Sequence, residues 1–132
     1  MTIVVLAVLA LATVAGLVYR ARYGRLRTHP GDLPSGLLTP AGDAVTLLHF
    51  SSATCAPCRQ VRRVCADVAG TVAGVRHVEL DADEHLDAVR ELGIWRLPTL
   101  LVVDRAGRVA SRTVGVPTRD DLRAAVTEVL AA

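Results

Sequence analysis

Residues 45–61 read VTLLHFSSATCAPCRQV, and this stretch decides the fold. Residues 45–50 form a continuous β-favouring run, which predicts a strand buried on both faces of a sheet. In residues 56–69 the apolar side chains recur at helical spacing, which predicts an amphipathic helix that stops at Gly70. Two cysteines stand between this strand and the first turn of this helix.

The two cysteines, Cys55 and Cys58, are separated by Ala56 and Pro57. The strand delivers Cys55 to the C-terminal edge of the sheet, where the helix presents unpaired N–H groups and the positive end of its dipole. These groups favour a thiolate over a thiol, so Cys55 is predicted to be the nucleophile. Cys58 lies one turn inside the helix, where it is shielded and can attack a mixed disulfide. Pro57 suits the first helical turn because no N–H is needed there.

Other interpretations of the cysteine pair are weaker. A zinc site would need a second close pair of ligands, and Cys65 with isolated histidines does not provide one. Cys65 would lie about 10 Å along the helix axis from Cys58, too far for a disulfide, and is predicted to be a small core residue. Residues 81–85, DADEH, are interpreted as a strand end and a helix cap. We therefore predict no metal site.

Three further strands are predicted after this helix. They cover residues 75–80, 99–103 and 109–114, and a turn at 104–107 joins the last two as a hairpin. The first of them is followed by a predicted helix, and a second helix ends the chain. The order of elements predicts an α/β fold with one mixed sheet of four to five strands and helices on both faces.

Capping residues mark the starts of these two helices. Asp83 is placed to cap a helix over residues 84–92, and Thr118 to cap the last helix, whose first turn holds acidic residues that the helix dipole favours. The buried side of the first is predicted to carry Leu86, Val89 and Leu92, and that of the second Leu122, Ala125, Val126 and Val129.

The folded domain is predicted to occupy residues 44–132, preceded by a linker at 23–43. Residues 28–36 are rich in turn formers and show no periodicity. The pair at 37–38, Leu-Leu, is interpreted as a short strand before a turn at 39–43.

The N-terminal region, residues 1–22, is predicted to be a transmembrane helix with a basic flank. Residues 3–19 form a run of 17 without a charge, and as a helix this run would span about 26 Å, enough to cross a bilayer with little tilt. A cleaved signal peptide is the alternative, but such a peptide normally opens with a basic region, which Met1 and Thr2 do not supply.

Charge is distributed unevenly along the chain. The first 29 residues hold four arginines and no acid, whereas the rest holds 11 Arg against 13 Asp and Glu. Because cationic flanks tend to stay on the cytoplasmic side, we predict a single-pass protein of the cell membrane with its domain in the cytoplasm. Contact of the arginines with lipid headgroups would be compatible with an extracytoplasmic domain. No nucleic-acid binding is predicted, because the basic cluster adjoins the apolar run.

Four stretches carry a resemblance to a known family: CAPCR at 55–59, LDAD at 80–83, GIWRLPTL at 93–100, and Gly115. Together they resemble the thioredoxin family, over roughly residues 44–132. The resemblance implies a thioredoxin fold and thiol–disulfide exchange with protein substrates.

The resemblance also implies roles for individual residues. Cys55 and Cys58 would form a redox-active disulfide, with no other cofactor. The peptide bond before Pro98 would be cis, Pro98 would pack beside the dithiol, and the backbone of Leu97 would pair with an extended substrate segment. The predicted substrate-binding residues are Ala56, Pro57, Trp95, Leu97 and Pro98, and the predicted structural residues are Thr99 and Gly115.

The chain departs from the family at two charged positions. Thioredoxins usually place a buried Asp where this chain has His49, and often a Lys where it has Glu79. We hypothesise that Glu79 orients His49, which then helps to deprotonate Cys58. The alternative is that His49 is a hydrogen-bonded core residue.

Aromatic residues that flank the dithiol in the family are also missing, with Ser51 and Thr54 in their places. The face around Cys55 is therefore predicted to be small-sided and open. Trp95, the only tryptophan, either restores some apolar surface near Pro98 or packs in the core.

Two functions follow from the sequence. The first is a membrane-tethered oxidoreductase that exchanges disulfides with protein thiols, fed by an unidentified electron donor; a cytoplasmic position favours the reducing direction. The second is a non-catalytic binding or scaffold module at the membrane, against which the intact cysteine pair argues.

Overall fold

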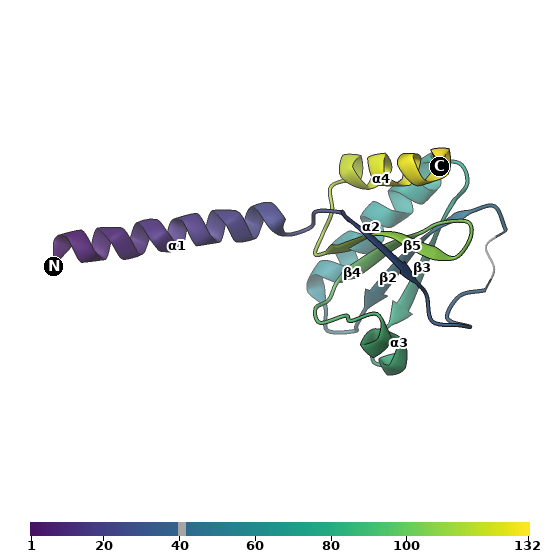
Figure 1. Cartoon of the computed structure of the whole chain (residues 1–132), viewed down its shortest axis with the longest axis horizontal. Helices are drawn as coiled ribbons and strands as arrows, with labels where there is room; N and C mark the ends of the chain where they lie inside the picture. The colour runs from purple at the N-terminus through teal and green to yellow at the C-terminus, as the bar shows by residue number, and fades with distance from the viewer. Residues whose placement is uncertain (40–41) are drawn as a thin grey trace.

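The computed structural model describes residues 1–39 and 42–132. A long N-terminal helix projects from one end of a layered α/β domain (Figure 1). The elements in chain order are α1 (Thr2–Arg22), β1 (Arg27–Asp32), β2 (Val45–Ser51), α2 (Ala56–Thr71), β3 (Val75–Asp81), α3 (Leu86–Glu91), β4 (Thr99–Val103), β5 (Arg108–Val114) and α4 (Arg119–Ala131).

The five strands form one mixed sheet in the order β1-β5-β4-β2-β3. β2 and β3 run parallel, and the other three pairs are antiparallel. The predicted mixed sheet, with its β4–β5 hairpin, is therefore confirmed. The crossover between the parallel strands is α2, so the C-terminal end of β2 and the N-terminal end of α2 meet at one edge of the sheet.

Alternate side chains of β2 point into two separate core layers. Val45 and Leu47 pack with apolar residues of α2 and α4, whereas Leu48 and Phe50 pack with Ala88 of α3 and with its neighbours. Every residue of β2 is buried, which confirms a strand covered on both faces. Figure 1 shows α2 and α4 on one side of the sheet and α3 on the other. Cys65, predicted to be a core residue, is fully buried in the first layer.

The predicted linker contains a strand that the sequence pattern does not reveal. β1 pairs antiparallel with β5 at the edge of the sheet, and its register shifts between Thr28 and Gly31. All six of its residues are exposed, so no hydrophobic alternation marks it, and an edge strand tolerates its proline. The short strand predicted at 37–38 is wrong, because these residues form a bend. The turn predicted at 39–43 includes 40 and 41, which lie outside the described residues.

Two predicted helix ends are also wrong. Gly70 lies inside α2, which continues to Thr71. α3 begins at Leu86, with His85 as its N-cap, and not after Asp83. Asp83 instead lies in the turn after β3, where its N–H donates to a carboxylate oxygen of Asp81 at 2.8 Å.

The apolar side of α3 is rotated from the predicted one. Leu86 is half exposed, and the buried residue of this helix is Ala88. Val89 and Leu92 do pack against the core beneath α3. The cap on α4 is confirmed, because the hydroxyl of Thr118 accepts the N–H of Asp121 at 3.1 Å.

α1 is long and apolar enough to cross a membrane, with a mean hydropathy of 2.5 over its most apolar 18-residue window and no buried residue. Its length of 21 residues corresponds to about 31 Å, close to the thickness of a hydrocarbon core. A signal sequence near an N-terminus has the same properties.

Candidate active site

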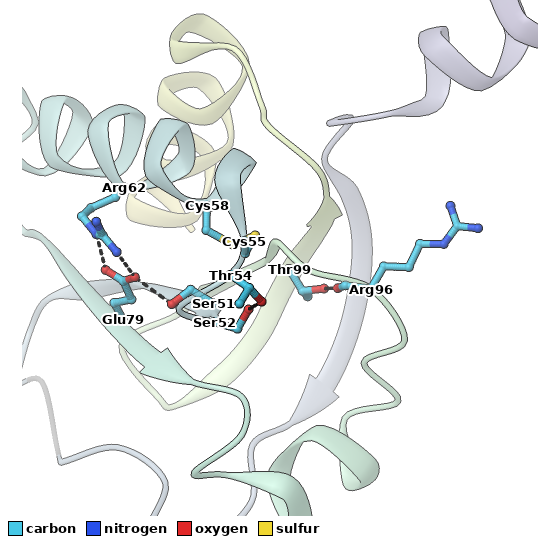
Figure 2. Close-up of a disulfide and its surroundings, with 9 residues drawn as sticks. All are labelled: Ser51, Ser52, Thr54, Cys55, Cys58, Arg62, Glu79, Arg96 and Thr99. Atoms are coloured by element: carbon cyan, nitrogen blue, oxygen red, sulfur yellow. Dashed lines mark hydrogen bonds and ion pairs between the residues drawn. A yellow bond between two sulfur atoms is a disulfide. The ribbon is translucent and has the colours of Figure 1, made fainter.

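The two cysteines lie where the sequence places them. Cys55 is the N-cap of α2, Pro57 stands in the first turn, and a disulfide joins Cys55 to Cys58 (Figure 2). Cys58 is buried at 1% exposure, whereas Cys55 is partly exposed and its neighbours Ala56 and Pro57 are exposed. The outer sulfur is therefore the one that an incoming thiol or disulfide can reach.

The loop before β4 belongs to the surroundings of this disulfide. The Leu97–Pro98 peptide bond is cis, as the resemblance implies; Pro98 is buried and Leu97 half-buried. The hydroxyl of Thr99 donates to the carbonyl of Arg96 at 2.6 Å and braces the loop (Figure 2). The carbonyl of Pro98 accepts the N–H of Gly115 at 2.9 Å. Thr99 and Gly115 thus fix the position of the Pro98 loop.

A charged pair lies between α2 and β3. Arg62 donates to both oxygens of the Glu79 carboxylate at 2.6 Å, and the hydroxyl of Ser51 donates to one of them at 2.7 Å (Figure 2). These bonds, chiefly those from Arg62, lower the pKa of Glu79 to about 2. Glu79 therefore stays ionised at neutral pH and ties α2 to the sheet.

The structure contradicts part of the hypothesis about His49. The hydrogen bonds to Glu79 come from Arg62 and Ser51, and within the described residues neither ring nitrogen of His49 has a hydrogen-bond partner. Glu79 lies opposite His49 on the neighbouring strand, but its carboxylate is already occupied by the guanidinium. Glu79 does not orient His49, and His49 is not a hydrogen-bonded core residue either.

His49 is nevertheless placed on the cysteine side of the sheet. Its position in the alternation of β2 puts it in the layer of α2, and its ring stacks on that of His77 with centroids 5.9 Å apart. Burial, more than any neighbouring charge, lowers the pKa of His49 to about 4. The buried imidazole is therefore neutral near neutral pH, with one lone pair free to accept a proton.

Trp95 is 92% exposed, so the alternative in which it packs in the core is wrong. The predicted open face beside Cys55 takes the form of a shallow hollow of about 290 Å³, lined by Cys55 itself and by Ser52, Ala53, Thr54, Ala56, Arg59 and Arg62. Ser51 does not line it, because its side chain is turned inward to Glu79. In the described part of the chain, no group of three or more His, Cys, Asp or Glu side chains is arranged to hold a metal ion.

Comparison with known proteins places this site in a family. The thioredoxin family model matches residues 39–128. This chain belongs to the thioredoxin family. It is 31% identical over 90 residues to the thioredoxin of Alicyclobacillus acidocaldarius, an alignment covering 67% of this chain and 85% of that one.

Solved thioredoxin structures agree with this assignment. Chloroplastic thioredoxin z is 28% identical with a TM-score of 0.60, covering 68% of this chain and 81% of its own. Thioredoxin of Malassezia sympodialis is also 28% identical, with a TM-score of 0.58, and covers 69% and 81% respectively. As a thioredoxin family member, the chain is a thiol–disulfide oxidoreductase, and family members act on disulfides of proteins.

Sequence reasoning missed two residues near this thioredoxin site. No role was predicted for Arg62, because nothing in the sequence spacing pairs it with Glu79, 17 residues further along the chain. Tyr23 lay in the predicted linker, yet its ring covers Gly115. No pattern in the sequence indicates that contact, because it joins segments about 90 residues apart.

Proposed function

We propose that this chain is a membrane-tethered thioredoxin that reduces protein disulfides through Cys55 and Cys58. The observation that carries the proposal is the asymmetry of the pair: Cys55 is partly exposed at the amino end of α2, and Cys58, bonded to it, is buried one turn further in. An exposed attacking sulfur and a shielded resolving sulfur are what two-step exchange requires.

The reaction begins with the reduced dithiol. The thiolate of Cys55 attacks one sulfur of a substrate disulfide, and the other substrate sulfur leaves as a thiolate and takes up a proton. Cys58, once deprotonated, attacks the sulfur of Cys55 and releases the second substrate thiol. The substrate gains two electrons, and the Cys55–Cys58 disulfide is formed. A dithiol electron donor must then reduce this disulfide.

His49 is proposed to accept the proton of Cys58 in the second step. It lies in the layer that α2 covers, it is neutral, and its ring nitrogens are not engaged. With a pKa of about 4 it is a weak base, so proton transfer would accompany the attack on Cys55 and not precede it.

Substrate contacts are proposed for the residues around Cys55. Ala56 and Pro57 are exposed, and Leu97, half-buried before the cis Pro98, is proposed to pair its backbone with an extended substrate segment. Trp95, whose indole is uncovered, adds apolar surface to the same loop.

The tether is proposed to be α1, retained in the membrane. Its length and composition support a span, and Arg20 and Arg22 stand in its last turn. Because basic flanks favour the cytoplasmic side, the domain is proposed to face the cytoplasm, which is consistent with the reducing direction.

Insulin reduction tests the activity. The full chain in detergent micelles, supplied with dithiothreitol, should precipitate insulin by cleaving its disulfides. Cys55→Ser should abolish the activity, and Cys65→Ser, which changes a buried cysteine outside the site, is the matched control. Equal rates for the wild type and Cys55→Ser would refute the catalytic role.

Labelling tests the tether and its orientation. The chain should remain in the membrane fraction after alkaline carbonate extraction, and release into the soluble fraction would contradict the anchor. A membrane-impermeant maleimide should leave Cys55 unlabelled in intact cells and label it after lysis. Rapid labelling in intact cells would contradict the cytoplasmic position.

A further inference from the structure

The junction between α1 and the domain packs against the domain instead of hanging free. The N–H of Gly24 donates to the carbonyl of Val114 at 2.9 Å. Gly24 also approaches Val116 so closely that an added Cβ would lie 2.1 Å from the carbonyl oxygen of that residue. The chain that leaves α1 is therefore fixed to the end of β5.

Tyr23 extends this contact to the loop of Pro98. Its ring lies over Gly115, where an added Cβ would meet ring carbons at 2.6–2.8 Å. Gly115 in turn donates its N–H to the carbonyl of Pro98 at 2.9 Å. Only one glycine therefore separates the ring of Tyr23 from the Pro98 loop.

A second contact joins α1 itself to the same loop. The guanidinium of Arg96 donates to the hydroxyl of Tyr19 at 3.3 Å, and the ring of Tyr19 stacks on that of Tyr23 with centroids 6.1 Å apart. Tyr19 lies one turn inside the C-terminal end of α1 at Arg22. Arg96 therefore reaches back along the helix, to the depth of its last turn (Figure 2 shows this side chain extending away from the disulfide).

This depth corresponds to the membrane interface when α1 spans a bilayer. Tyrosine and arginine at the end of an apolar helix lie at the level of the headgroups. Figure 1 shows the whole domain beyond the C-terminal end of α1, so a bilayer can surround α1 without overlapping the domain. The Pro98 loop reaches α1 itself, through the hydrogen bond from Arg96 to Tyr19.

The side chains on this surface suit an anionic bilayer. Trp95, next to Arg96, is 92% exposed, and indole rings prefer the headgroup region, where one edge is apolar and the other wet. Arg96 adds its charge to a juxtamembrane cluster, and cations so placed are attracted to anionic lipids. The cluster consists of Arg20, Arg22, Arg25 and Arg27.

We propose that the Pro98 loop rests on the bilayer surface, with Trp95 and Arg96 among anionic phospholipid headgroups, and that the dithiol is thereby held at the membrane side of the domain. This inference rests on the proposed membrane tether. Its consequence is a preference among substrates: disulfides close to the membrane surface can reach Cys55, whereas disulfides of soluble proteins away from the membrane have less access to it.

The single tryptophan makes the proposal directly measurable. The full chain is reconstituted into vesicles of phosphatidylcholine and phosphatidylglycerol, with and without a lipid that carries a nitroxide on its headgroup. Trp95 is expected to lose most of its fluorescence to the nitroxide. Unquenched Trp95 fluorescence in vesicle-bound protein would overturn the proposal and leave the tether standing.

A matched control separates orientation from attachment. Eight Gly and Ser residues inserted between Arg22 and Tyr23 add a flexible reach of about 15 Å and leave Tyr23 and Gly24 on the domain. This variant is expected to float with the vesicles but to show much weaker quenching. Equal quenching of the wild type and the insertion variant would overturn the role of the junction. Failure of the wild type to float with vesicles would contradict the proposed tether, and therefore also this inference.

Discussion

Replacing His49 with leucine removes a buried imidazole whose protonation the fold opposes. The pKa of His49 is lowered from 6.5 to about 4, chiefly by burial. In the unfolded chain the ring takes up a proton near pH 6.5, whereas in the folded domain it does so only near pH 4. The unfolded state therefore binds more protons in this range, and stability falls as the pH falls from about 6.5 to about 4.

The size of this loss follows from the shift. One pKa unit corresponds to about 1.4 kcal/mol, so the shift of His49 makes the wild type about 3 kcal/mol less stable at pH 4 than at pH 7, before other groups are counted. Leucine fills a similar space without titrating, and it also removes a buried N–H without a partner, which costs about 1–3 kcal/mol. His49→Leu is therefore expected to be the more stable protein, by a margin that grows as the pH falls.

Urea unfolding of residues 23–132, followed by circular dichroism between pH 4 and pH 8, measures this margin. The difference between the free energies of unfolding of the two proteins at each pH cancels the contribution of the carboxylates, which both proteins share. His77, whose pKa is also lowered by burial, remains in both and gives each a residual dependence of the same sign. Parallel stability profiles for the wild type and His49→Leu would refute the assignment of a neutral, buried His49.

Three further outcomes are expected. The pair of Arg62 with Glu79 stabilises the wild type fully above pH 4.5, the ordinary pKa of the carboxyl, and this stability is lost as the pH falls towards 2. Glu79→Gln should lack this stability at neutral pH, and similar acid unfolding of both proteins would contradict the pair. Gly115→Ala should cost about 1–3 kcal/mol, because φ is +100° and the Tyr23 ring fills the space. Adding Tyr23→Ala should recover only part of that cost in a double-mutant cycle, and full recovery would mean that the backbone is unstrained. Cys65, whose pKa is raised to about 12 by burial, should resist iodoacetamide until urea unfolds the domain, and rapid labelling of folded protein would contradict its place in the core.

The centre of the fold could be predicted because its signals are local. The β-favouring run before Cys55 and the helical spacing after Cys58 each extend over a dozen residues or fewer, and both reflect burial that the structure confirms. β1 was not predicted, because an exposed edge strand has no apolar face that would mark it in the sequence. Its pairing with β5 depends on backbone hydrogen bonds, which leave no trace in side-chain pattern.

The residues of the site also fall into those that short motifs predict and those that only tertiary packing brings together. The dithiol and Pro98 were predictable because they belong to short motifs, whereas the partner of Glu79 was not. The predicted pairing of Glu79 with His49 followed from the family positions that the two residues occupy, those of a buried Asp and a Lys. In the structure an arginine from α2 instead donates two hydrogen bonds to the carboxylate. Helix-to-sheet contacts of this kind depend on tertiary packing and not on sequence spacing.

Alkylation of the reduced protein by iodoacetamide at a series of pH values, with the modified cysteine identified by mass spectrometry, tests the central claim most directly. The helix end that holds Cys55 predicts that this residue is modified first, and that its reaction persists well below about pH 8.5, where an ordinary cysteine becomes ionised. Cys58 should stay unmodified while the domain is folded. Preferential modification of Cys58, or a profile for Cys55 that matches a cysteine in an unstructured peptide, would contradict the assignment of Cys55 as the nucleophile.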